Sequence, residues 1–550
     1  MVSANPQRGE TFPLRSNPGV FVATGFLCLV VAYALVSELR LNGGVFTYGR
    51  DDAYIHMAIA RNLALHHVWG ITRYGFVSAS SSPLWTSLVA ITDWIFGVSD
   101  KSPLILSFLS AIALLWSISR LMARNGLGRG AITVTLLAIV FVMPLPYLVL
   151  DGMEPALHTT FTIWFLYLAG ETLNDKRSEA RCNIELGVLA MFLVGARFEG
   201  IFLVALTAGL LVLQRRYIAA IVITGLAAVP ILALGIPSVW HGGWVLPNSV
   251  MLKGTGLSRN LSASGVTLAT TAFVNLRACK TLLVIVLLAI VAALGADPSN
   301  RQSAHRLRLA LFISISFLHL AFAQIGNPFR YEAYLIATGI VLIALSFKEP
   351  GFQRLLSTPF VFASRSSFST VATTVALTVV IVLISLPLLG RGAYGMIRAD
   401  RASHNCFEQQ YQIARFIHRF YQGQTVVLSD IGFVSYFDDV RVIDSTGLGS
   451  NEIAHNNGRA GGEILETSAH NERAKIAIVY PAWIPHVPKS WTKVGEWELH
   501  DITVSLGGRT VVFYATCAAQ VELIRHQLDD FRSELPREVE ARIFDDAQHL

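Results

Sequence analysis

Long apolar runs separated by short polar turns cover roughly the first 390 residues of the chain. A run of about 20 apolar residues is what an α-helix needs to cross the hydrocarbon core of a bilayer. The pattern predicts about eleven membrane-spanning helices. The predicted spans are residues 20–39, 102–121, 131–149, 155–172, 184–197, 199–213, 217–237, 279–296, 308–325, 331–347 and 368–389.

The pattern changes after Arg391 to one that alternates short apolar segments with amphipathic ones. This alternation is typical of a small α/β domain. We therefore predict a polytopic α-helical transmembrane domain over residues 1–390 and a soluble α/β domain over residues 391–550. Its predicted elements are a helix at 405–420, strands at 425–429, 440–444, 475–480, 494–498 and 511–515, and a charged amphipathic helix at 520–535.

Basic residues gather in alternate loops between the predicted spans, which is typical of loops on the cytoplasmic side. This orientation requires that the apolar segment ending near Val98 lies along the outer surface instead of crossing the bilayer. The first run, 20–39, is too long for a signal peptide and is predicted to remain as a helix. An odd number of spans then puts the C-terminal domain outside. The inside loops carry Arg120, Arg124 and Arg129; Lys176, Arg177 and Arg181; Arg215 and Arg216; Arg301, Arg306 and Arg308; and Lys348 and Arg354.

Composition supports a membrane protein, because 53% of the 550 residues are hydrophobic and only 15% are charged, with a mean hydropathy of +0.52. The net charge of +6 falls largely in the inside loops, so it does not indicate nucleic-acid binding, and no basic patch alternates with aromatic residues. The five cysteines have no metal or redox spacing. Cys406 and Cys517 could form a disulfide in the C-terminal domain or remain two free thiols.

Acidic, basic and amide side chains recur in the turns predicted to face outward. Glycosyl transfer from a lipid phosphate needs such a set, because a carboxylate removes the proton of the acceptor hydroxyl and cations stabilise the departing phosphate. Uncompensated acids at a bilayer surface are costly and usually have a chemical task or an ionic partner. The residues are Asp51 and Asp52, Glu154, Arg197 and Glu199, Asn248 and Lys253, and Arg330.

Each of these residues also has a simpler structural interpretation. Asp51 or Asp52 could cap the helix that follows, and Arg330 could extend to the lipid interface. Glu154 and Glu199 could be turn residues paired with Arg197, and Lys253 could be solvated. The nearby histidines have no metal-ligand companions at helical spacing and are predicted to be packing or surface residues; they are His56, His66 and His67.

Several short motifs, in order along the chain, resemble those of the GT-C superfamily of polytopic glycosyltransferases, most closely the AftB-like arabinofuranosyltransferases. They are Asp51-Asp52-Ala53-Tyr54, Ala60-Arg61-Asn62-Leu63, Ser82-Pro83-Leu84-Trp85-Thr86, Gly152-Met153-Glu154-Pro155, Ala196-Arg197-Phe198-Glu199-Gly200, Leu246-Pro247-Asn248-Ser249 with Lys253, Asp430-Ile431-Gly432, and Arg441-Val442-Ile443-Asp444-Ser445-Thr446-Gly447-Leu448. Position 198 is Phe where the family often has Pro.

The resemblance implies an inverting glycosyltransferase that uses a polyprenyl-phosphate sugar on the extracytoplasmic face of the bacterial inner membrane. Its acceptor would be an envelope glycan, glycolipid or protein. Asp51 would be the general base and Asp52 would orient a substrate. Arg330, Arg197 and Lys253 would bind the donor phosphate, and the sugar or acceptor would contact Glu154, Glu199, Asn248, Tyr54 and Tyr331. No cofactor is implied with certainty; Asp51, Asp52 and a phosphate leave room for a divalent cation.

Two other functions fit a polytopic protein with an outer domain. In a transporter or lipid flippase, charged groups inside the membrane form a relay for protons or substrate. Here the charges lie in turns and no inverted repeat is apparent, so the sequence favours the transferase. In a binding or sensory protein, the α/β domain would capture an envelope ligand.

Overall fold

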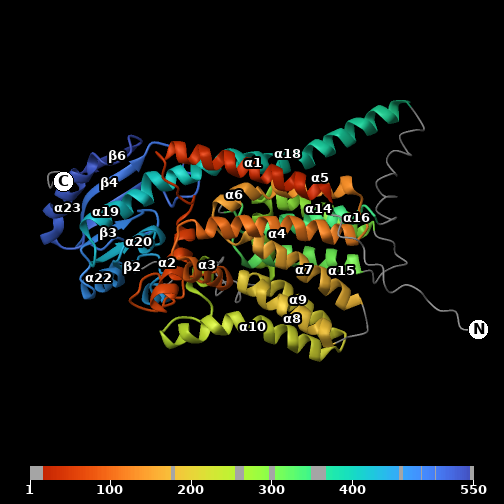
Figure 1. The fold of residues 1–550 in the computed structure, drawn as a ribbon, viewed down its shortest axis with the longest axis horizontal. Helices are drawn as coiled ribbons and strands as arrows, with labels where there is room; N and C mark the ends of the chain where they lie inside the picture. Colours follow the sequence, from red (N-terminus) through yellow and green to blue (C-terminus); the bar gives the residue numbers. More distant parts are fainter. Residues whose placement is uncertain are drawn as a thin grey trace, which may run out of the picture.

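The computed structural model describes residues 17–174, 180–253, 265–295, 304–326, 328–348, 367–456, 462–484, 486–501 and 503–544. A bundle of helices forms one end of the elongated molecule and a domain built on a β-sheet forms the other, with α2 (Asp51–His66) and α3 (Pro83–Phe96) between them (Figure 1). The described residues therefore contain a helical domain and a C-terminal sheet domain, and the boundary at residue 390 stays a prediction.

Every predicted span coincides with a helix of the structure, although the boundaries differ. The span predicted at 131–149 is two helices, because Pro144 and Pro146 interrupt the hydrogen-bond pattern. The helix α13 was not predicted, and it meets α14 at a bend of 109°. The helices are α1 (Pro18–Leu41), α4 (Ser102–Arg124), α5 (Arg129–Val142), α6 (Leu145–Leu150), α7 (Pro155–Asn174), α8 (Ala180–Ala196), α9 (Gly200–Leu213), α10 (Tyr217–Trp240), α11 (Asn248–Lys253), α13 (Gly265–Ala278), α14 (Lys280–Leu294), α15 (Ala304–Phe322), α16 (Ala333–Ser346) and α18 (Ser367–Cys406).

Four helices of the described chain, α1, α4, α10 and α15, are long and apolar enough to cross a membrane, or five if α13 and α14 form one broken span. Shorter apolar helices, α5, α9 and α16, lie among them. The helix α3, at about 21 Å, is shorter than a bilayer core and lies beside α2 next to the sheet domain (Figure 1). These features are those of a membrane protein, while the number of eleven spans stays a prediction.

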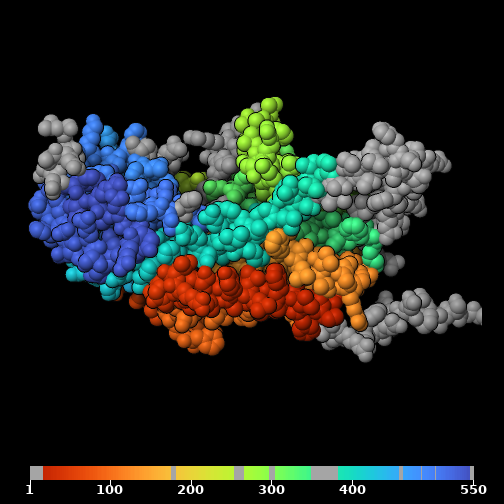
Figure 2. Space-filling model, turned by 90° about the horizontal axis from the view of Figure 1, so that it is seen from above, coloured from red at the N-terminus to blue at the C-terminus, as the bar shows by residue number. Residues whose placement is uncertain are grey.

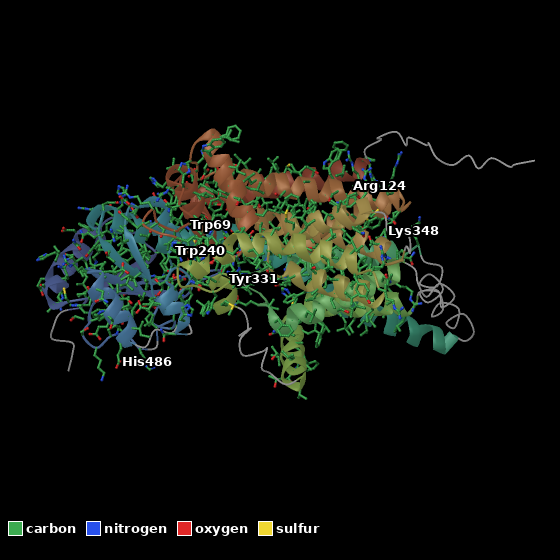
Figure 3. All side chains as sticks on the ribbon, turned by 90° about the horizontal axis from the view of Figure 1, so that it is seen from below. Trp69, Arg124, Trp240, Tyr331, Lys348 and His486 are labelled. Atoms are coloured by element: carbon green, nitrogen blue, oxygen red, sulfur yellow. The ribbon has the colours of Figure 1, made fainter. Side chains whose placement is uncertain are left out.

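The basic ends of the helices lie opposite the sheet domain. Arg124 and Lys348 mark that end (Figure 3), where the Lys348 ammonium donates to the Asn125 carbonyl oxygen at 2.6 Å. The arrangement agrees with one set of basic loops on one side, and the assignment of that side to the cytoplasm stays a prediction. Four of the predicted loop residues lie outside the described residues: Lys176, Arg177, Arg301 and Arg354.

In the described part of the sheet domain, six strands form one sheet in the order β2-β1-β3-β5-β4-β6. The pairs β1–β2 and β1–β3 are parallel, whereas β3–β5, β4–β5 and β4–β6 are antiparallel. All five predicted strands are confirmed, and β6 was not predicted. The strands are β1 (Thr425–Leu428), β2 (Arg441–Asp444), β3 (Ile476–Val479), β4 (Thr492–Leu499), β5 (Thr510–Ala515) and β6 (Val539–Ile543).

Helices cover both faces of this sheet. Phe416 of α19 (Gln412–Phe420) and Phe531 of α23 (Val521–Arg532) pack against Trp497 and Phe513 on one face. On the other face, α21 (Asn451–His455) and α22 (Gly462–Asn471) bury Ile453, Leu465 and Ala469 against the sheet. The remaining helices are α20 (Gly432–Phe437), a π-helical turn (Phe407–Tyr411) and a short 3₁₀ turn (Ala518–Gln520). Cys406 is buried and Cys517 is exposed, and both are free thiols.

The two domains share a continuous junction. The helix α18 runs unbroken through the domain boundary predicted at residue 390, and it lies against α1 along one side of the molecule (Figure 2). The helix α2 packs directly on α20, where the rings of Tyr54 and Phe433 lie 3.6 Å apart. Residues of α2 and of the sheet domain belong to one buried apolar cluster. The sheet domain is therefore fixed against the start of α2, where the predicted site lies.

Candidate functional site

Asp51 and Asp52 are the first two residues of α2, and Arg50 occupies the cap position. Neither aspartate acts as the N-cap of its own helix. The Asp51 carboxylate accepts hydrogen bonds from the backbone N–H groups of Gly432 at 2.7 Å and Phe433 at 2.8 Å. These N–H groups begin α20, so the first carboxylate of α2 joins the helical domain to the sheet domain.

Burial raises the pKa of Asp51 well above its ordinary value of 3.8, and the nearby negative charge of Asp430 raises it further. The two backbone N–H groups oppose this shift because they stabilise the ionised form. A carboxyl group with a raised pKa retains a proton to higher pH and is a stronger base when it is ionised. Asp51 thus has the electrostatic surroundings of a group that exchanges protons.

Asp52 belongs to a chain of ion pairs. Its carboxylate lies 2.7 Å from Nη1 of Arg330. Nη2 of the same guanidinium lies 3.1 Å from Oε1 of Glu154, which also lies 2.6 Å from Nη1 of Arg197. Arg197 in turn pairs with Glu199 at 2.6 Å. The turns that follow α6, α8 and α15 therefore meet at the first turn of α2, and we call these five residues the ion-pair chain.

The two arginines are held in place from several sides. Both guanidinium groups are buried, with 3% and 1% of the Arg197 and Arg330 side chains exposed. Each lies over the ring of Tyr331, at 5.1 Å and 5.7 Å from its centre, and Figure 3 labels Tyr331 near the middle of the molecule. Arg330 is therefore not an arginine that extends to the lipid interface.

The arginines control the ionisation of the acids between them. Burial alone would raise the pKa of Glu154, but the charges of Arg330 and Arg197 lower it to about 2. Arg197 likewise lowers the pKa of Glu199 to about 2 against the effect of burial. Burial lowers the pKa of His56 to about 4, and its Nδ1 lies 2.7 Å from the Thr86 hydroxyl. Glu154 and Glu199 are thus ionised and His56 is neutral at neutral pH.

A second buried ion pair joins the start of α2 to the turn that follows α6. Nε of Arg50 lies 2.9 Å from the Asp151 carboxylate. Asp151 begins the turn that carries Glu154, and Gly152 in that turn has a φ of +65° and lies against the ring of Tyr48. A side chain at position 152 would be strained and would collide with that ring. The turn therefore depends on glycine to bring Glu154 close to the arginines.

Two cavities meet at Asp52. A polar cavity of about 530 Å³ lies between α2 and the sheet domain, and it is lined by Asp51 and Asp52. A mostly apolar groove of about 190 Å³ is lined by Asp52, Arg197 and Glu199 at one end and by Phe198, Ile201, Phe202, Ile231, Leu246, Val250 and Phe322 along its length. Gln324 also lines both. Of the ion-pair chain, Asp52 therefore lines both the polar cavity and the apolar groove, and Arg197 and Glu199 line the groove.

Three predicted site residues lie elsewhere. Tyr54 is buried under Phe433, and its hydroxyl accepts from the Tyr48 N–H at 3.1 Å. Asn248 is fully buried, and it donates to carbonyl oxygens of the sheet domain and to Asn451 at 2.9 Å. The side chain of Lys253 lies outside the described part of the chain. Tyr54 and Asn248 therefore connect the domains, and direct contacts of these three with a sugar or phosphate stay predictions.

Among the described residues no group of three or more His, Cys, Asp or Glu side chains is arranged to hold a metal ion. Asp52 is engaged by Arg330 and Asp51 by backbone N–H groups. A divalent cation at this site would therefore need oxygen ligands from a bound phosphate, and its presence stays a prediction.

Sequence reasoning missed several residues of the polar cavity, including Gln410, Asp430 and Trp483. The tripeptide Asp430-Ile431-Gly432 stands out in the sequence, but nothing in it tells that Gly432 and Asp430 face Asp51. Arg50 and Asp151 flank predicted site residues directly. A charged residue next to a catalytic motif was the available signal for this pair.

A family model described as a domain of unknown function (DUF8728) matches residues 400–514, within the sheet domain and the helices that lead into it. No curated protein matches this chain.

Among solved structures, ArnT from Cupriavidus metallidurans in the apo state is 16% identical with a TM-score of 0.48, and covers 91% of this chain and 99% of its own. The same enzyme bound to undecaprenyl phosphate is 14% identical with a TM-score of 0.45, covering 90% and 99%. The oligosaccharyltransferase of Archaeoglobus fulgidus, in complex with Zn and sulfate, is 12% identical with a TM-score of 0.44, covering 93% and 74%.

Proposed function

We propose that this protein is an inverting glycosyltransferase that moves a sugar from a polyprenyl-phosphate donor to an envelope glycan, glycolipid or protein. One observation carries the proposal: Asp52, at one end of the ion-pair chain, lines both a polar cavity and an apolar groove, and Arg197 and Glu199 of the same chain line the groove. A lipid-linked sugar has the same division, because an apolar chain, a phosphate and a polar sugar follow one another. The groove would take the first part of the chain, the arginines the phosphate, and the cavity the sugar.

In the proposed reaction Asp51 removes the proton from an acceptor hydroxyl, and that oxygen attacks the anomeric carbon of the donor sugar. The bond between this carbon and the phosphate oxygen breaks, and its electron pair leaves with the phosphate. The configuration at the carbon is inverted, and no covalent intermediate with the protein forms. Arg330 and Arg197 stabilise the charge on the departing phosphate.

The ion-pair chain suggests how the donor enters. In the structure Arg330 binds both Asp52 and Glu154. A phosphate at the end of the groove would compete with Asp52, whose side chain is 19% exposed, and would leave Glu154, which is fully buried, in place. Asp52 would then be released toward the polar cavity to orient the sugar. Glu154 and Glu199 would act chiefly by positioning the arginines.

The proposed location is the inner membrane, with the site and the sheet domain on the extracytoplasmic side. The basic helix ends at the opposite side of the helical domain favour this orientation. The location of the charges also favours a transferase over a transporter, because they lie at helix ends and in turns near the sheet domain.

The proposal is tested by purifying the full chain, identifying co-purified lipids by mass spectrometry, and supplying the corresponding labelled lipid-phosphate sugar with an envelope extract. We expect a polyprenyl-phosphate sugar to co-purify and its label to reach an acceptor in the wild type. Transfer should be lost in Asp51→Asn and reduced in Asp52→Asn. Undiminished transfer in both variants, or movement of an intact glycolipid across vesicles without transfer, would refute the proposal.

A further inference from the structure

The wall of the polar cavity that comes from the sheet domain carries side chains that the proposed reaction does not use. Gln410 lies in the π-helical turn, Asp430 follows β1, and Trp483 follows β3. All three line the cavity together with Asp51 and Asp52. This wall therefore faces the base and the place where a transferred sugar would be received.

Two of these side chains form a fixed polar pair. Nε2 of Gln410 donates to Oδ2 of Asp430 at 2.8 Å and to the Tyr480 hydroxyl at 3.2 Å. The Tyr480 hydroxyl lies 2.8 Å from the same Asp430 oxygen. Oε1 of Gln410 is buried and has no hydrogen-bond partner among the residues that the structure describes. A buried acceptor without a donor is unfavourable, so this oxygen suits a hydroxyl group supplied by a ligand.

Trp483 adds an aromatic surface to the same wall. Its ring packs on Tyr480 at 4.8 Å between ring centres, and 38% of the residue remains exposed. A side chain at Gly507 would collide with both rings, so glycine allows the tryptophan to hold this position. A rigid indole with a polar neighbour is suited to a sugar ring, whose C–H face is apolar and whose edge carries hydroxyls.

The charges lining the cavity discriminate among acceptors. Three carboxyl groups line it, from Asp51, Asp52 and Asp430. Of the cations, Arg50 lines it but is paired with Asp151 at 2.9 Å. An acceptor that placed a phosphate or carboxylate against this wall would meet like charges, which oppose binding.

We propose that Trp483, Asp430 and Gln410 form an acceptor subsite for an uncharged sugar ring, so that the acceptor is a neutral glycan. Trp483 supplies the stacking surface, and Asp430 and Gln410 accept hydrogen bonds from ring hydroxyls. This rests on the proposed function and goes beyond it by naming the chemical class of the acceptor and the residues that select it.

The test measures binding to the full chain in lipid nanodiscs of three probes: neutral oligosaccharides, the same oligosaccharides carrying carboxylate or phosphate groups, and undecaprenyl phosphate. We expect the wild type to prefer the neutral oligosaccharides. Trp483→Ala should weaken their binding by about tenfold, the size of one aromatic contact, and Trp483→Phe by less than about threefold. Gln410→Ala should weaken it as well.

Trp240→Ala is the matched control, because this tryptophan is 79% exposed at the end of α10 and does not line the cavity. It should leave all binding unchanged, and undecaprenyl phosphate should bind every variant equally. Preference for the charged oligosaccharides, no saccharide binding, or wild-type binding by Trp483→Ala would overturn the subsite. If Asp51-dependent transfer of labelled sugar from the lipid-phosphate donor were still observed, the proposed function would stand even though the acceptor subsite had been refuted.

Discussion

The two walls of the polar cavity are built differently. The wall from the helical domain carries Arg50, Asp51 and Asp52. Asp52 connects this wall to the ion-pair chain, in which each arginine is bound by two carboxylates. The wall from the sheet domain offers neutral hydrogen-bonding groups and an indole, with Asp430 as its acid. Charge on one side suits a phosphate, and amide and aromatic groups on the other suit a sugar. Asp51 lies between them and is bound to both domains.

Asp51→Asn should have the largest effect, because it removes the group that belongs to both walls. Loss of a general base lowers rates by about 10²–10⁴-fold. We expect kcat for sugar transfer to fall by this factor. Binding of undecaprenyl phosphate should change little, because it depends on the arginines of the ion-pair chain. Single-turnover transfer and lipid binding measured on the same preparation distinguish these effects.

The control for this variant is Asp439→Asn, which removes an acid that is paired with Arg73 at the exposed surface. It should keep wild-type transfer. If Asp51→Asn abolished lipid binding along with transfer, Asp51 would be holding the two domains together and would not be the base.

Glu154→Gln should have the next largest effect, on stability. It leaves Arg197 and Arg330 without the acid that they share, and breaking a buried ion pair typically costs about 3–5 kcal/mol. Glu199→Gln is the matched control, because Glu199 is partly exposed and, within the described part of the chain, forms an ion pair only with Arg197. We expect it to cost clearly less, as measured by denaturant unfolding in detergent. Equal losses of stability in the two variants would show that the carboxylate shared by both arginines contributes no more than Glu199 does.

The same acids predict how stability depends on pH. Their pKa of about 2 lies below the ordinary value of 4.5, so the folded state favours the ionised form. Their contribution is present above pH 4.5 and is lost as the pH falls toward 2. A shift of this size corresponds to about 3 kcal/mol for Glu154. The free energy of unfolding, measured between pH 5 and 2, should fall as the pH is lowered, and it should fall less steeply in Glu154→Gln.

The sequence predicts much of the helical-domain side of the site, but little of the side that the sheet domain contributes. The turns that carry Glu154, Arg197 and Arg330 are short and join apolar helices, so topology alone puts them on one side. The five strands were equally visible, because short apolar segments stand between polar ones. The strand β6 (Val539–Ile543) alternates apolar and charged residues as a half-buried strand does, but it has only five residues and follows a charged helix, so the sequence analysis did not separate it from that charged segment.

The other wall depends on contacts that no local pattern carries. Gly432, which donates to Asp51, is 381 positions away along the chain. Nothing around Asp430 or Trp483 in the sequence indicates that they face α2. The sequence also did not indicate that one helix, α18, continues across the predicted domain boundary. Long-range packing of one domain on the other, with Tyr54 against Phe433, decides these positions.

Asp430→Asn tests whether the sheet-domain wall tunes the base. Asp430 raises the pKa of Asp51, in addition to the effect of burial. Removing its negative charge should lower that pKa, so that Asp51 becomes ionised at lower pH. We expect the rise of kcat with pH to move toward acid, as measured in a pH series with saturating donor. Asp439→Asn, at the exposed surface, should leave the profile in place, and an alkaline shift would contradict the assignment.

Asn248→Ala should have the smallest effect, because it alters a contact between the domains outside the cavity. Asn248 donates to the carbonyl oxygens of Gly447 and Leu448 at 3.3 Å and to Asn451 at 2.9 Å. Leaving these acceptors without a donor should cost about 1–3 kcal/mol. Hydrogen exchange in residues 444–456 should become faster, whereas exchange in the central strands β1 and β3 should not change. Transfer should persist, because Asn248 does not line the polar cavity; loss of transfer would instead support the predicted contact of Asn248 with the sugar or acceptor.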